Sequence, residues 1–174
     1  MSRAPEPTEW IALGVLGKAR GLRGDVWFRS YNEASEAAAP GVTVRLTLRD
    51  GSQRKCAVAA AAVHGNERCL RFEGHGDRVS AEGLVGATVA LQRQDFPALE
   101  EGEFYHCDLP GVRVVDVAGR EVGTVTRVEA YPTVDALVVT TADGEVEVPL
   151  TDAVLRSLDL AARVATVDLS AFEL

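Results

Sequence analysis

Three cations near the N-terminus, Lys18, Arg20 and Arg23, lie in a stretch of residues 14–26 that is also rich in glycine. Glycine allows positive φ angles and close approach of the backbone, and Lys and Arg side chains attract phosphate groups. We expect this stretch to form a loop between two strands. Two interpretations stay open: the cations contact RNA phosphate, or they decorate a solvated basic turn. The glycines expected to shape the loop are Gly14, Gly21 and Gly24.

The spacing of the glycines does not fit a nucleotide-binding motif. A P-loop requires four residues between its first glycine and a Gly-Lys-Ser/Thr sequence. Here Gly14 and Gly17 are too close together, and Ala19 follows Lys18. The glycine spacing of dinucleotide-binding proteins is not met either. We therefore reject nucleotide binding in this stretch.

Two adjacent aromatic residues, Phe104 and Tyr105, form the second candidate site. In an extended chain neighbouring side chains point to opposite faces, so both rings cannot enter one core. One ring should reach the surface, where aromatic side chains often provide much of the energy of a protein interface. The alternative is that the pair packs in the core. A sharp corner is predicted just after it, from Asp108 to Gly111, because Asp, Pro and Gly favour turns.

The cysteines and histidines do not indicate a metal site or a disulfide framework. Cys56, Cys69 and Cys107 are odd in number and lack the C-x-x-C spacing of zinc ligands. The three histidines are scattered among different predicted elements, and the carboxylates are dispersed rather than clustered with a base or nucleophile. The sequence therefore predicts a protein without catalysis and without a cofactor.

The pattern of apolar residues predicts many short strands. Valine and leucine alternate with threonine and arginine over residues 42–48, which is the clearest strand pattern in the chain. Short helices are predicted at 32–39, 80–84 and 151–158. Overall, we expect an all-β protein: two small β-barrels or sandwiches joined by a short acidic linker, with a few short helices. Further strands are expected at 10–15, 26–29, 55–63, 69–72, 88–93, 112–117, 122–128, 136–141, 146–148 and 164–167.

Charge is unevenly distributed between the two halves. Residues 1–95 contain 13 Lys and Arg against 11 Asp and Glu, a net +2, whereas residues 96–174 contain 5 against 15, a net −10. This asymmetry suggests two surfaces for two kinds of partner, although an acidic surface can also serve solubility alone. We expect 1–95 to form an N-terminal six-stranded barrel and 102–174 to form a second barrel.

The sequence does not indicate a membrane protein. Its apolar runs are too short to cross a bilayer, and the N-terminal residues lack the basic-then-apolar order of a signal peptide. We expect a cytoplasmic monomer that does not contact a membrane.

Two ordered segments of the chain resemble the ribosome maturation factor RimM family. The first segment is the glycine-containing stretch that ends at Val26, and the second follows the acidic linker. They stand in the order and at the separation found in that family, and the resemblance covers nearly the whole chain. In the second segment, the resemblance rests on Glu103, Phe104, Tyr105, His106, Asp108, Leu109, Pro110, Gly111, Gly119, Glu121, Val122, Gly123 and Asp135.

The resemblance implies an N-terminal barrel like that of translation-factor second domains and a C-terminal PRC-type barrel. It also implies an assembly factor without catalysis, which binds the nineteenth protein of the small subunit, in the head, and assists maturation of the small subunit and the 3′ domain of 16S rRNA. The family's paired aromatics fall on Phe104 and Tyr105, where the first is often Tyr. Arg20 replaces the family's usual His, and the final segment 168–174 lacks its usual Gly-Leu ending.

Two other functions remain open at this point. One is a PRC-type module that binds another protein outside translation. The other is an RNA-modifying or RNA-processing protein built on small barrels, which would require a clustered set of acids, bases or metal ligands.

Overall fold

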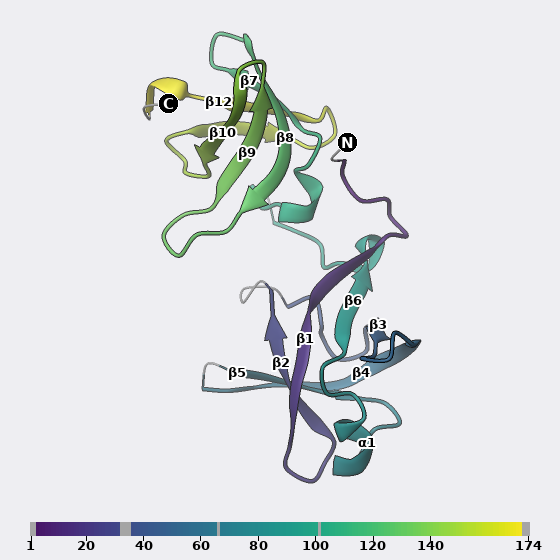
Figure 1. Ribbon diagram of the computed structural model, residues 1–174. Helices are drawn as coiled ribbons and strands as arrows, with labels where there is room; N and C mark the ends of the chain where they lie inside the picture. The colour runs from purple at the N-terminus through teal and green to yellow at the C-terminus, as the bar shows by residue number, and fades with distance from the viewer. Residues whose placement is uncertain (1–2, 32–35, 66, 101, 172–174) are drawn as a thin grey trace. The chain divides into compact units, whose positions relative to one another are not determined.

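The computed structural model describes residues 3–31, 36–65, 67–100 and 102–171. The chain forms two compact units, Glu6–Ala98 and a second unit built on Leu99–Leu174. In Figure 1 the first unit runs from purple to teal and the second from teal through green to yellow. Strands dominate both units and the helices are few and short, so the prediction of an all-β protein is confirmed.

The first unit is a closed barrel of six strands in the order β1-β2-β5-β4-β3-β6, and all of its strand pairs are antiparallel. One short helix, α1 (Arg78–Glu82), precedes the last strand, and a 3-10 turn, η1 (Arg93–Asp95), follows it. The strands are β1 (Trp10–Arg20), β2 (Asp25–Ser30), β3 (Thr43–Thr47), β4 (Gln53–His64), β5 (Glu67–Phe72) and β6 (Thr88–Gln92).

Strand β1 closes the barrel by pairing with β2 on one side and β6 on the other. The register shifts beside Gly14 in the pairing with β6 and between Leu16 and Ala19 in the pairing with β2. Such bulges bend a strand and increase its twist, which a small barrel needs in order to close. Gly14 is required at this bend because a Cβ there would collide with the carbonyl oxygen of Arg29 and the ring of Phe28.

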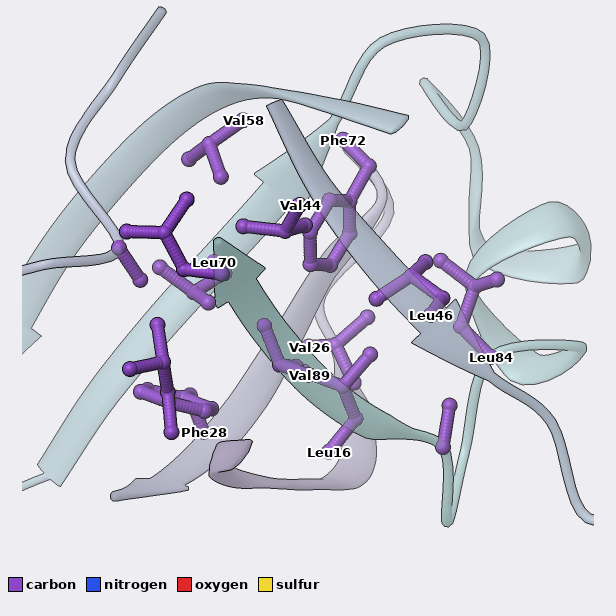
Figure 2. Close-up of a cluster of buried hydrophobic side chains, with 14 of the residues drawn as sticks. Leu16, Val26, Phe28, Val44, Leu46, Val58, Leu70, Phe72, Leu84 and Val89 are labelled. Carbon is purple, nitrogen blue, oxygen red and sulfur yellow. The ribbon is translucent and has the colours of Figure 1, made fainter. Parts of the chain in front are cut away.

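Most of the barrel core is filled by strand residues, many of them at alternate positions, and Figure 2 shows these side chains. In β3, Val44 and Leu46 are completely buried, whereas Thr43, Arg45 and Thr47 between and beside them are not. This is the alternation that the sequence predicts for a strand with one face in a core. The core residues labelled in the figure are Leu16, Val26, Phe28, Val44, Leu46, Val58, Leu70, Phe72, Leu84 and Val89.

The second unit is a six-stranded sheet in the order β10-β9-β8-β7-β12-β11. β12 and β7 are parallel, and the other pairs are antiparallel. The 3-10 turns η2 (His106–Asp108) and η3 (Leu169–Ala171) flank the strands. The strands are β7 (Arg113–Asp116), β8 (Glu121–Glu129), β9 (Ala136–Thr141), β10 (Gly144–Pro149), β11 (Leu155–Asp159) and β12 (Val164–Val167).

The strands predicted at 112–117 and 122–128 are β7 and β8, which form a hairpin, and the carboxylate of Asp116 holds its turn. Asp116 Oδ1 accepts hydrogen bonds from the backbone N–H groups of Arg120 (2.8 Å) and Ala118 (2.9 Å), and Arg120 Nε donates to Oδ2 (2.7 Å). These hydrogen bonds, above all the one from the Arg120 backbone, lower the pKa of Asp116. Gly119 supplies the positive φ, 79°, that the turn requires.

Two helix predictions in the first unit need correction. Of the helix predicted at 32–39, residues 32–35 lie outside the described residues, and residues 36–39 are not helical. Ala37 and Ala38 are buried in the barrel core instead, so packing outweighs helix propensity. The helix predicted at 80–84 begins earlier, because α1 spans Arg78–Glu82. Its N-cap is Asp77, whose side chain accepts a hydrogen bond from the Ser80 backbone N–H at 2.9 Å.

The helix predicted at 151–158 is wrong, because residues 151–154 form a turn and strand β11 occupies the rest of that range. Leu155 and Leu158 are three residues apart, a spacing that suits one face of a helix. In the structure, a bulge between Leu155 and Ser157 shifts the register with β12. The extra residue places both leucines on the core side of an edge strand, where they pack against the buried cluster of the second unit.

Candidate functional site

Phe104 and Tyr105 lie in an irregular segment between Gly102 and η2, and both side chains are partly buried. Phe104 packs against the hydrophobic core of the second unit, and its ring centroid lies 6.4 Å from that of His106. The ring therefore has a packing role, the alternative that the sequence left open. Its remaining surface is accessible to a partner.

Phe104 also lines a groove of about 530 Å³ on the second unit. This volume lies within the usual range for ligand-binding clefts. The groove runs beside β11, which is an edge strand of the sheet, and edge strands and apolar grooves both serve peptide recognition. Four leucines provide the apolar part of its lining, and Glu103, Asp152 and Arg156 provide charge. The lining residues are Gly102, Glu103, Phe104, Leu150, Thr151, Asp152, Leu155, Arg156, Ser157, Leu158 and Leu160.

Arg163 fixes the corner that follows the aromatic pair. Its guanidinium donates hydrogen bonds to the backbone carbonyl oxygens of Asp108 and Pro110. Gly111, with φ 84°, completes the corner. Sequence reasoning found the corner but missed Arg163, which lies more than fifty residues later along the chain. A lone arginine in a distant turn gives no local signal, although its own positive φ of 57° marks the site in the structure.

His106 connects η2 to the segment that precedes β9. Its Nε2 lies 3.2 Å from Oδ2 of Asp135, and both side chains are partly exposed. The scattered positions of the histidines in the sequence do not reveal this contact, which ties the residue after the aromatic pair to Asp135. We assign the contact a role in shaping this end of the unit.

The described residues offer few groups for chemistry. Across these parts of the chain, no three side chains of His, Cys, Asp or Glu gather as metal ligands would. The three cysteines, all among the described residues, are not in disulfides. Burial raises the pKa of the Cys56 and Cys69 thiols, which makes them weaker nucleophiles at neutral pH. The helices in the described ranges are all too short or too polar to cross a membrane.

The loop predicted at residues 14–26 is wrong in its first half. Strand β1 continues to Arg20, and only residues 21–24 form the turn. Gly14 therefore lies inside a strand, where its missing side chain allows close packing rather than a loop. Gly21 and Gly24 lie in the turn with φ of 63° and 83°, as the prediction requires.

The three candidate cations gather at the end of the hairpin formed by β1 and β2. Lys18 and Arg20 lie on β1 and Arg23 lies in the turn. Lys18 and Arg23 are exposed, whereas the Arg20 guanidinium is partly buried and lies 5.1 Å from the centroid of the Trp27 ring. A groove of about 500 Å³ lies beside Trp27. It is lined by Gly17, Trp27, Phe28, Arg29, Ser30, Val63, Glu67 and Arg68.

Comparison with known proteins gives matches that span both units. The RimM N-terminal domain matches residues 11–96 and the RimM PRC barrel domain matches residues 106–172. The ribosome maturation factor RimM of Sorangium cellulosum is 38% identical over 151 residues, covering 86% of this chain and 89% of that protein. The protein of the same name from Anaeromyxobacter sp. is 38% identical over 162 residues, covering 91% and 94%.

Among solved structures, the N-terminal domain of RimM from Thermus thermophilus is 26% identical, with a TM-score of 0.43 and coverage of 53% of this chain and 99% of that one. The domain matches and the sequence identity to the two RimM relatives establish the family of this chain, because they extend over most of its length. The chain belongs to the ribosome maturation factor RimM family.

Proposed function

We propose that this protein is a non-catalytic assembly factor of the cytoplasm. It binds the nineteenth protein of the small ribosomal subunit, in the head, and assists maturation of that subunit and of the 3′ domain of 16S rRNA. The observation that carries the proposal is that both units of the chain match domains of one ribosome maturation factor. A second domain outside that family would have favoured a different role.

The second unit provides the surface that we assign to the ribosomal protein. The half of the chain that contains it has 5 Lys and Arg against 15 Asp and Glu. Ribosomal proteins are generally cationic, so the charges are complementary. The groove beside β11 adds an apolar anchor site with Phe104 in its lining, and Tyr105 lies next to it. Aromatic anchors surrounded by polar residues are a frequent arrangement in protein interfaces.

We assign Lys18, Arg20 and Arg23 to contact with the RNA backbone. Their position at one end of a hairpin would let all three face a single phosphate strand. Replacing all three by Gln should weaken binding to the precursor particle but leave binding to the isolated ribosomal protein unchanged. Unaltered affinity for the particle would show that these residues form only a solvated basic turn.

The proposal is tested by purifying the tagged full-length protein from cells and identifying what it carries. We expect the nineteenth small-subunit protein in the eluate, and co-sedimentation of the factor with small-subunit precursors but not with mature subunits. A protein that stays at the top of the gradient, with a partner unrelated to translation, would favour a PRC-type module with another role. Turnover of an RNA substrate by the pure protein would contradict the non-catalytic assignment.

A further inference from the structure

Four adjacent strands of the barrel contain no carboxylate. In the order β4-β3-β6-β1 these strands are neighbours, and their sequences hold no Asp or Glu. The strand carboxylates of the barrel are confined to β2 and β5, where Asp25 is neutralised by Arg71 at 2.8 Å. This side of the barrel therefore has only positive charge on its strands. Its cations are Lys18, Arg20, Arg45, Arg54 and Lys55.

Two of these cations meet on the ring of Trp10. Arg45 Cζ lies 4.8 Å and Lys55 Nζ lies 5.3 Å from the ring centroid. Arg45 on β3 and Lys55 on β4 are directly opposite in register, and the neighbours of Arg45 in β3 are fully buried, so its side chain lies on the outer face. We call Trp10, Arg45 and Lys55 the Trp10 cluster. The indole ring attracts both cations and thereby holds two like charges close together.

The Trp10 cluster has no acidic partner among the residues that the structure describes. In the described ranges, no carboxylate forms an ion pair with Arg45 or Lys55. The Nε atom of Arg45 is buried and has no hydrogen-bond partner there. Glu9, the neighbour of Trp10, instead accepts a hydrogen bond from the Glu6 backbone at 3.1 Å. A partly desolvated cation without a counter-charge is costly, and an external anion would relieve that cost.

We propose that the Trp10 cluster binds the phosphate backbone of RNA. The inference rests on the proposed function for the source of that RNA, the small-subunit precursor. Such a particle offers RNA phosphate and cationic proteins, and a positive surface attracts the first and repels the second. Positive charge beside an aromatic ring is also the combination by which many proteins hold single-stranded nucleic acid.

The Trp10 cluster is separate from the cations Lys18, Arg20 and Arg23 near the β1–β2 turn. Trp10 and Arg20 are the first and last residues of β1. At about 3.3 Å per residue they are roughly 33 Å apart along the strand. The barrel thus has two sites for RNA at opposite ends of β1, and RNA bound at both would be held across the face of β1.

The test measures binding of the full-length protein to a transcript of the 16S rRNA 3′ domain at several salt concentrations. The variant is Arg45→Gln with Lys55→Gln. The slope of the logarithm of the binding constant against the logarithm of the salt concentration is negative, and removing two phosphate contacts should make it less steep by about 2. Binding should also weaken roughly tenfold near physiological salt. The matched control is Arg78→Gln with Arg127→Gln, which removes the same charge from cations already paired with carboxylates: Arg78 with Glu82, and Arg127 with Glu129 and Glu145. It should leave the slope unchanged.

Three outcomes would overturn the inference. The first is a variant that binds the transcript with the wild-type slope and affinity. The second is an equal loss in the control, which would mean that only net charge matters. The third is normal binding of the transcript with loss of a protein partner, which would assign the cluster to an acidic protein. If the wild type binds neither precursor nor transcript, the proposed function fails as well, so the two failures are distinguishable.

A second measurement tests the inference without the Arg45→Gln, Lys55→Gln variant, in case that variant fails to fold. The chain has two tryptophans, so in Trp27→Phe the indole emission comes from Trp10 alone. Adding the transcript to that protein should change the emission, and the change should disappear at high salt. Emission that stays constant while the RNA is bound would place the RNA elsewhere and overturn the inference.

Discussion

Arg163 is a single side chain on which the geometry beside the aromatic pair depends. Its guanidinium satisfies two carbonyl groups in the corner from Asp108 to Gly111, and the turn that carries it adopts a backbone conformation that non-glycine residues rarely use. The corner sets the direction in which the chain enters β7. The position of η2, and of the aromatic residues before it, thus depends on a residue far away in sequence.

We expect Arg163→Met to destabilise the second unit by about 1.5–3 kcal/mol, the usual contribution of hydrogen bonds to a charged group. Methionine retains an apolar stem but leaves the carbonyls of Asp108 and Pro110 without their donor. Urea denaturation with a probe in the second unit measures the change. Arg113→Met, at an exposed position of β7, is the control and should have a change within about 0.5 kcal/mol. Equal stability of the two variants would mean that the corner holds without the guanidinium.

The double variant Phe104→Ala with Tyr105→Ala should show whether the aromatic pair serves mainly to bind a partner or to pack in the core. Phe104 is only partly buried, so its loss should cost less than the 3–5 kcal/mol typical of a fully buried Phe, and the protein should stay folded with a modestly lower Tm. Association with the small-subunit precursor should fall more than about tenfold, equivalent to 1.4 kcal/mol.

The control for this variant is Tyr131→Ala, an exposed aromatic of the same unit outside the groove. It should bind the precursor like the wild type. A double variant that unfolds would show that the pair serves the core. One that stays folded and binds normally would remove Phe104 and Tyr105 from the interface.

At the scale of elements, period-two patterns were sufficient to predict most strands, and bulges account for the main errors. The alternation around Val44 and Leu46 predicts β3 well because each residue faces the core or solvent without interruption. In β11 a bulge makes the leucine spacing resemble a helix, and in β1 glycines that permit bulges and close packing resemble a loop. Both errors have one cause. A bulge locally interrupts the alternation of core-facing and solvent-facing residues, and a bulge cannot be predicted without knowing which strand lies opposite.

The sequence allowed candidate residues to be chosen, but it did not predict how those residues are arranged in space. Phe104, Tyr105 and the cations of the first hairpin could be selected by type and spacing. The groove beside Phe104, the clamp by Arg163 and the meeting of Arg45 with Lys55 on Trp10 depend on pairings between segments far apart in the chain. Such contacts follow from sheet order and register, which local patterns do not determine.

Gly14→Ala tests the explanation given for β1. The added Cβ would collide with the Arg29 carbonyl and the Phe28 ring, so strands β1 and β2 must move apart. Overpacking of this kind costs about 1–3 kcal/mol, and thermal unfolding of the first unit should show it. Gly76→Ala is the control, because nothing lies within 4 Å of a Cβ at that position and its φ is not in the left-handed region. Two equally stable variants would show that Gly14 is not needed for close packing.

At the scale of the whole molecule, we predict that the two halves fold independently. The buried clusters of the two units share no residue among those described, so each unit has a core of its own. Fragments 1–95 and 96–174, expressed separately, should each unfold cooperatively and protect their strand amides from hydrogen exchange. A division at residue 118, which separates β7 from β8, is the control and should leave the second fragment unfolded. Loss of cooperative unfolding in both halves of the first division would contradict the prediction.

The charge of the second half should act mainly on the rate of association. Opposite fields speed the encounter of two proteins and affect dissociation much less. The Debye length falls from about 8 Å at physiological ionic strength to about 3 Å at 1 M, so added salt should slow association strongly. Stopped-flow mixing of the full-length protein with the purified ribosomal protein measures both rates.

Glu145→Gln with Glu147→Gln removes two exposed carboxylates from β10 and provides a local version of this test. The variant should associate more slowly than the wild type at low salt, and the two on-rates should converge as salt increases, because screening removes the difference between them. Arg78→Gln, which leaves the second unit unchanged, is the control and should not slow association. An on-rate that does not respond to salt would exclude electrostatic steering, and docking would then depend on the apolar groove that Phe104 lines.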